Sequence, residues 1–94
     1  MTESASSGAR YSRAEGAVLK RVGGAGAVYL PANGSLHVLN RTGEAIVRAL
    51  EEPASIEELA VALAAASGSP VDAVARDVAA FLPQLVELGV LVEA

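Results

Sequence analysis

The chain has 94 residues, enough for one domain with a modest hydrophobic core, and 52% of its residues are apolar. It contains no cysteine and a single histidine, which excludes a disulfide framework, a thiolate metal site and a histidine metal cluster. The net charge is −4: residues 40–94 hold nine acidic and three basic side chains, whereas residues 1–39 hold two acidic and four basic ones.

The first residues predict a tail and no targeting segment. Residues 1–13 are mostly Ser, Ala, Gly and Arg with little periodicity, so we expect a flexible N-terminal tail followed by one domain over residues 14–94. The tail lacks the apolar stretch of a secretory signal. The longest mainly apolar run is far shorter than the roughly 20 residues that span a bilayer. We therefore expect a cytoplasmic protein with no membrane partner.

Three short strands are predicted next, over residues 17–22, 27–31 and 35–39. The glycine-rich segment 23–26 is predicted to be the loop between the first two, because glycine favours turn geometry. Both faces of the second hairpin are largely apolar, although a small hairpin needs only one buried face. The second apolar face indicates a binding surface.

The turn of that hairpin is predicted at Asn33–Gly34. This dipeptide favours a two-residue type I′ turn, in which both central residues have positive φ. A two-residue loop pairs Pro31 with Leu36 across the strands and extends the ladder from there. The third strand is the last of the hairpin, so we expect its outer edge to be open.

Helix signals follow in close succession. Asn40 is expected to cap a first helix that runs to about Glu51. Ser55 with Glu58 three residues later forms a capping box for the second helix, and Gly68 is expected to end it.

The third helix is expected to have Ser69 as its N-cap, Pro70 as its first helical residue and Gly89 at its end. Pro83 lies inside its apolar pattern and kinks or breaks the helix; we favour a kink, because the apolar stripe keeps its phase. The predicted fold is α+β and winged-helix-like, an N-terminal three-stranded antiparallel sheet followed by a three-helix bundle.

Catalytic chemistry is not indicated. His37 has no second histidine or cysteine to work with, so the usual nucleophilic triads lack members. The segment 23–26 matches neither a phosphate-binding loop nor a dinucleotide fingerprint. We expect no enzyme, no cofactor and no metal site.

Two binding functions remain. A winged helix suggests a DNA-binding transcriptional regulator, but residues 55–88 offer only Arg76 among five acidic side chains and would repel a duplex. The alternative is capture of an extended peptide, which adds as a strand to an open sheet edge beside an apolar helix. We favour the peptide and expect no nucleic-acid partner.

Three segments carry a family resemblance. They are "LNRTGEAIVRAL" (39–50), "SIEELAVALA" (55–64) and "DVAAFLPQLVELGVL" (77–91), and their order and spacing resemble the PqqD-like family. This family is named after pyrroloquinoline quinone biosynthesis and includes the leader-binding proteins of lasso-peptide pathways. The resemblance spans roughly residues 17–92, and Pro83 departs from the helix-favouring residue expected there.

The resemblance implies a recognition element for ribosomally synthesised, post-translationally modified peptides. Such a domain binds the leader of a precursor peptide between the third strand and the third helix, and presents it to a modifying enzyme or leader peptidase. A lasso-peptide pathway is favoured, although a quinone-cofactor or other radical-enzyme pathway also fits, and a homodimer is compatible with the sequence. Carried over by position, the expected peptide contacts are Ser35, Leu36, His37, Val38, Ala73, Arg76, Asp77, Ala80, Phe81 and Gln84.

Overall fold

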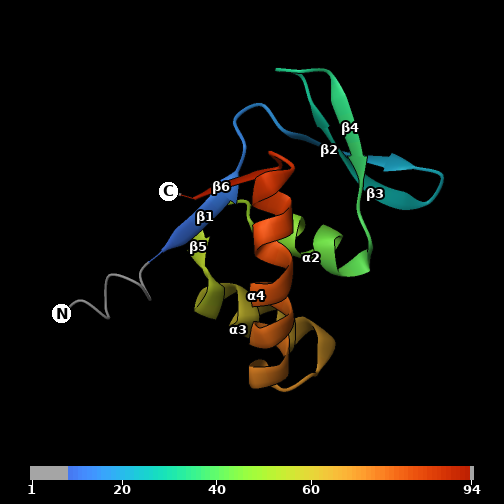
Figure 1. Cartoon of the computed structure of the whole chain (residues 1–94). Coiled ribbons are helices and arrows are strands. Elements are labelled where there is room, and N and C mark those ends of the chain that lie inside the picture. Colours follow the sequence, from blue (N-terminus) through green and yellow to red (C-terminus); the bar gives the residue numbers. More distant parts are fainter. Residues whose placement is uncertain (1–8, 94) are drawn as a thin grey trace.

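The structure, a computed structural model, describes residues 9–93 and has an α+β fold with two three-stranded antiparallel sheets and three helices (Figure 1). The first sheet has the order β2-β3-β4. Its strands are β2 (Val18–Val22), β3 (Ala25–Leu30) and β4 (Ser35–Val38). All three predicted strands are therefore present, with ends shifted by one or two residues.

The second sheet has the order β5-β1-β6 and was not predicted. Its strands are β1 (Arg10–Arg13), β5 (Ala54–Ser55) and β6 (Leu91–Glu93). The expected tail is corrected here, because its last four residues form the central strand and residues 1–8 lie outside the described residues. β1 is polar and short, and it is held by partners far away in sequence, so local composition gave no signal for it.

The hairpin between β3 and β4 has a four-residue loop, which corrects the predicted two-residue turn. Leu30 pairs with Ser35, so residues 31–34 form the loop and every predicted cross-strand pair is displaced by two residues. Gly34 has a φ of 73°, but Asn33 does not have the positive φ of a type I′ turn. Because Pro31 fixes its own φ near −65°, it favours a right-handed start to the turn.

Two-residue turn geometry occurs instead between β2 and β3. Val22 pairs with Ala25 across Gly23 and Gly24, which both have positive φ. The displacement of the other hairpin by two residues, rather than one, keeps every side chain on its predicted face. The prediction that both faces of the hairpin are apolar is therefore unaffected by the wrong turn length.

The helices are α2 (Arg41–Ala49), α3 (Ile56–Ser67) and α4 (Val71–Glu87). Asn40 caps α2 by accepting a hydrogen bond from the Gly43 amide at 2.7 Å. The predicted capping box of α3 is present between Ser55 and Glu58. Gly68 ends α3 in the left-handed conformation that its lack of a Cβ allows.

The start of α4 differs from the prediction. Pro70 is the N-cap rather than the first helical residue, and no side chain caps the helix. The Ser69 amide donates to the Ser67 hydroxyl instead, in the link between the helices. Helix α4 continues through Pro83 as one helix, so the proline does not break it.

One hydrophobic core joins the sheets and helices. Its members are Val28, Leu30, Leu39, Ile46, Val47, Leu50, Leu59, Val78, Leu82, Leu85, Val90 and Leu91. In Figure 1 the two sheets lie on opposite sides of α4, which contributes three of these residues. Within residues 9–93 no helix has the length and apolarity needed to cross a bilayer.

Candidate functional site

Strand β4 is an edge of its sheet. Among the described strands it pairs only with β3, through the register Ala27↔Val38 to Leu30↔Ser35. The Leu39 amide donates to the Gly26 carbonyl at 2.9 Å, which places Leu39 in a hydrogen-bonded pair. Hydrogen-bonded and non-hydrogen-bonded pairs alternate along an antiparallel ladder. The N–H and C=O groups of Leu36 and Val38 therefore point away from β3, toward the open edge.

The exposed side chains of β4 are apolar. Leu36 retains 48% and Val38 retains 62% of its accessible surface, whereas Ser35 and His37 on the other face are half-buried. An open edge with exposed apolar side chains is a surface that proteins normally protect unless a partner covers it. This strand therefore has both the main-chain groups and the side chains to receive another chain.

A hollow of about 120 Å³ lies between the end of β4 and the C-terminal end of α4, and we refer to it as the β4–α4 hollow. It is lined by Val38, Leu39, Asn40, Gly43, Phe81, Gln84, Leu85 and Leu88. None of these side chains is charged, and most are apolar. The hollow is therefore suited to an apolar side chain of a chain that lies along β4.

The β4 wall of the hollow is fixed by the turn into α2. The Leu39 amide bonds to β3, and two residues further the chain enters the helix that Asn40 caps. Gly43 is buried behind this cap, and a Cβ there would lie 3.3 Å from the Asn40 side-chain oxygen. The short link leaves β4 little freedom to move relative to α2.

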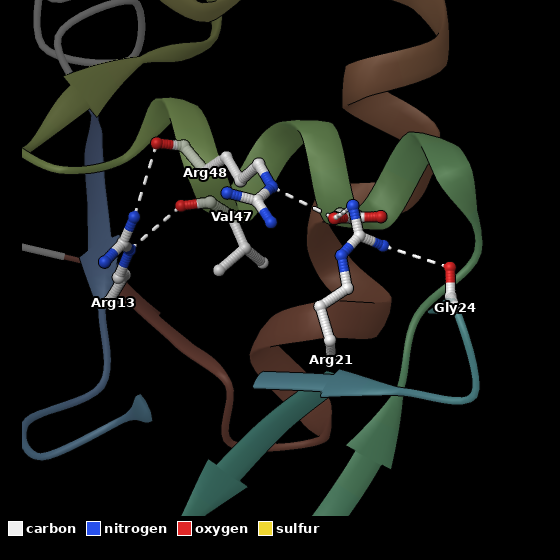
Figure 2. A network of polar contacts seen from close by, with 6 residues as sticks. Arg13, Arg21, Gly24, Val47 and Arg48 are labelled. Carbon is white, nitrogen blue, oxygen red and sulfur yellow. Dashed lines mark hydrogen bonds and ion pairs between the residues drawn. The ribbon is translucent and has the colours of Figure 1, made fainter. Parts of the chain in front are cut away.

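A polar network ties the same sheet to α2 (Figure 2). One oxygen of Glu44 forms an ion pair with Arg21 on β2 at 3.3 Å and accepts a hydrogen bond from Arg48, one turn further along α2, at 3.0 Å. Glu44 is 16% exposed and lies over Gly26, where a Cβ would overlap its carboxyl group. The sheet can therefore approach α2 closely only with glycine at position 26.

Arg13 connects the second sheet to the other end of α2. Its side chain donates to the carbonyl oxygens of Val47 at 2.9 Å and Arg48 at 3.3 Å (Figure 2). These carbonyls lie in the last turn of α2, where the helix dipole makes a cation favourable. Helix α2 is therefore held at both ends, which positions the wall of the hollow.

A chain of hydrogen bonds orders the start of β4. The Ser35 hydroxyl donates to the Asn33 side-chain oxygen at 2.6 Å, and the Ser35 amide donates to the same oxygen at 3.0 Å. Because the hydroxyl proton is used, Ser35 Oγ accepts from His37 Nε2 at 3.1 Å. His37 is thus oriented along its own strand as a positioned polar group.

The expected contact residues fall into two groups. The first group lies on β4 or lines the hollow, and consists of Ser35, Leu36, His37, Val38, Phe81 and Gln84. The second group is exposed on α4 outside the hollow, and consists of Ala73, Arg76, Asp77 and Ala80. Asp77 lines a different hollow, which is formed with α2 and α3.

Five lining residues were not among the expected contacts: Leu39, Asn40, Gly43, Leu85 and Leu88. The apolar stripe of the third helix contained the signal for Leu85 and Leu88, but the sequence did not show which part of the stripe stays exposed. No signal indicated that a helix cap would form a wall. Within residues 9–93, no group of three His, Asp or Glu side chains could hold a metal ion.

Comparison with known proteins gave one finding. The family model described as coenzyme PQQ synthesis protein D (PqqD) matches residues 17–91, which is most of the chain. These residues include β4, α4 and the hollow between them. No curated protein and no solved structure matched the chain.

Proposed function

The chain belongs to the PqqD family, and we propose that it binds the leader of a ribosomally made precursor peptide by strand addition and presents it to a modifying enzyme or leader peptidase. The family supports a peptide-binding partner in the biosynthesis of ribosomally synthesised, modified peptides. The observation that carries the proposal is the open edge of β4 beside an uncharged hollow on α4.

Strand addition fits this edge in physical terms. A peptide along β4 would take main-chain hydrogen bonds from Leu36 and Val38, which supply affinity without regard to sequence. Specificity would come from a side chain placed in the β4–α4 hollow, against Phe81 and Leu85. Both elements act by binding, so we also propose that the protein has no catalytic activity of its own.

We propose that the peptide contacts are the expected residues of β4 together with Phe81 and Gln84. Ala73, Arg76, Asp77 and Ala80 would contact a peptide only if it continues along α4 beyond the hollow. The acidic side chains of α3 and α4 do not favour a DNA duplex as the ligand.

The architecture and the pathway are also proposals. The sheet β2-β3-β4 and the three helices follow each other in the order of the predicted winged-helix-like arrangement, with the sheet as the wing. A lasso-peptide pathway is the type that we favour, and the location is proposed to be cytoplasmic. The genes beside this one test the pathway: a short precursor and a separate leader peptidase are expected.

The test of the binding mode is a titration of isotope-labelled protein with the precursor peptide encoded beside its gene, followed by amide NMR. The largest shifts are expected at Leu36–Val38 and along Phe81–Leu88. Shifts confined to α3 would contradict the proposed site.

A further inference from the structure

The face of the sheet β2-β3-β4 that points away from the core carries a second apolar surface, which we call the outer face. The register places Val18, Tyr29 and Leu36 in one row across the three strands, and Val38 in the next row with Lys20 and Ala27. The opposite face carries Val28 and Leu30, the two residues of β3 that belong to the hydrophobic core cluster. Four side chains of the outer face are large, apolar and exposed, namely Val18, Val22, Leu36 and Val38.

The outer face is linked to the peptide edge by the geometry of β4. Leu36 and Val38 direct their main-chain groups to the open edge, and the same two residues place their side chains on the outer face. Directly opposite residues on neighbouring strands have side chains on the same face of a sheet. A peptide residue level with Leu36 or Val38 would therefore place its side chain on the outer face, whichever direction the peptide runs.

From this geometry, and resting on the proposed leader binding, we propose that the protein recognises leader side chains on both faces of the sheet. Residues level with Leu36 and Val38 are apolar and pack on those two side chains. The peptide residue level with Leu39, next to the one level with Val38, points to the other face, toward the β4–α4 hollow. The leader class is therefore a segment that is apolar at the two outer positions and also at the position next to them that enters the hollow.

The leader is the favoured occupant because the exposed apolar surface is continuous with the open edge. The exposed fraction is 43% at Val18 on β2, and it is higher on β4, with 48% at Leu36 and 62% at Val38, whereas Ala27 on β3 between them is buried. The β2 side of the same surface carries Lys20, a charge that disfavours burial, whereas β4 carries no charged residue. An added strand covers the β4 side and leaves the β2 side in water.

The test begins with a phage-displayed library of random short peptides selected on the intact protein. Enriched peptides are expected to carry apolar residues at two positions separated by one, with a third apolar residue next to them. Intermolecular NOEs are expected between peptide methyl groups and the methyl groups of Leu36 and Val38.

Variants then separate the two proposals, with affinities measured by fluorescence anisotropy. Leu36→Thr and Val38→Thr are each expected to weaken the selected peptides roughly tenfold, because each loses contact with a buried apolar group. Val61→Thr on α3 is the matched control, since Val61 is 57% exposed and lies outside the site, and no change is expected. Thermal unfolding of each variant checks that the fold is retained.

Each outcome decides one of the proposals. One outcome would overturn the proposed recognition on both faces but leave the binding mode intact. In this outcome the peptides lose affinity for the Leu36→Pro variant, yet they bind the Val38→Thr variant unchanged and tolerate Ser or Asp at both of their outer positions. A library that yields no peptide sensitive to Leu36→Pro would overturn the binding mode itself. A wild-type dimer that Val38→Thr dissociates would show that a second copy covers the outer face, and would overturn the inference.

Discussion

The two edge strands of the sheet β2-β3-β4 differ in how they meet solvent. Among the described strands each pairs only with β3. β2 carries two adjacent cations, Lys20 and Arg21, and Arg21 is tied to Glu44 of α2. β4 carries no charged residue and exposes Leu36 and Val38. One edge has the protection typical of a strand that must not pair, and the other lacks it.

The other sheet strengthens this comparison. Its edge strands β5 and β6 have two and three residues, and Arg10 fixes the neighbourhood of β5 by bonding to the Pro53 carbonyl and to Glu58. Edge strands this short offer few main-chain groups to a foreign chain. The difference between the edges supports the proposal that β4 receives a peptide, because only this edge combines an uncharged strand with exposed apolar side chains.

The largest expected effect is a difference in stability between two proline variants of β4, one that removes an N–H pointing to β3 and one that removes an N–H pointing to the open edge. His37→Pro removes an N–H that points to β3 and leaves a carbonyl of β3 unpaired, so it is expected to lower the free energy of unfolding by about 2 to 3 kcal/mol. Leu36→Pro removes an N–H that points to the open edge, so its cost in stability should be about 1 kcal/mol or less, while peptide binding weakens markedly. Urea denaturation compares the two, and equal losses would mean that β4 is an internal strand.

The second prediction gives β4 the protection that β2 already has. Leu36→Lys places a charge where a docked peptide would bury it, so affinity for the precursor peptide should fall about tenfold with little change in stability. Val18→Lys is the matched control, because Val18 lies in the same row of the outer face on β2 and is about equally exposed. Calorimetric titration measures both variants, and equal losses of affinity would place the peptide elsewhere on the sheet.

The third prediction compares the ties that hold the two sheets to the helices. Glu44→Ala leaves Arg21 and Arg48 without their shared, largely buried acceptor and is expected to cost about 1 kcal/mol of stability. Arg10→Ala breaks an ion pair in which both side chains are about half exposed, and should cost less than about 0.5 kcal/mol. Thermal unfolding in low salt distinguishes them, and the reverse order would mean that Glu44 does not anchor the sheet.

Local signals in the sequence were enough for the helices. Asn40, the capping box at Ser55 and the left-handed Gly68 each satisfy main-chain groups within a few residues, so a short window contains the whole interaction. The edge position of β4 was also predictable, because a hairpin followed at once by a helix leaves its last strand unpaired on one side.

Long-range pairings were not predictable in the same way. β1 was assigned to a tail because its partners lie in β5 and β6, and nothing near it in sequence indicates them. The prediction of a two-residue hairpin turn was wrong because Pro31 and the Asn33 side chain act together with Gly34 to form a four-residue loop. The hollow depends on where the end of α4 lies beside Asn40 and Gly43, which is a property of packing rather than of any motif.

The most direct test of the open edge is hydrogen exchange at single amides of β4, without and with the precursor peptide encoded beside the gene. In the free protein we expect the amides of Leu36 and Val38 to exchange quickly and those of His37 and Leu39 slowly, and the peptide should protect the fast pair. Slow exchange at all four amides in the free protein, or no added protection with bound peptide, would contradict the account.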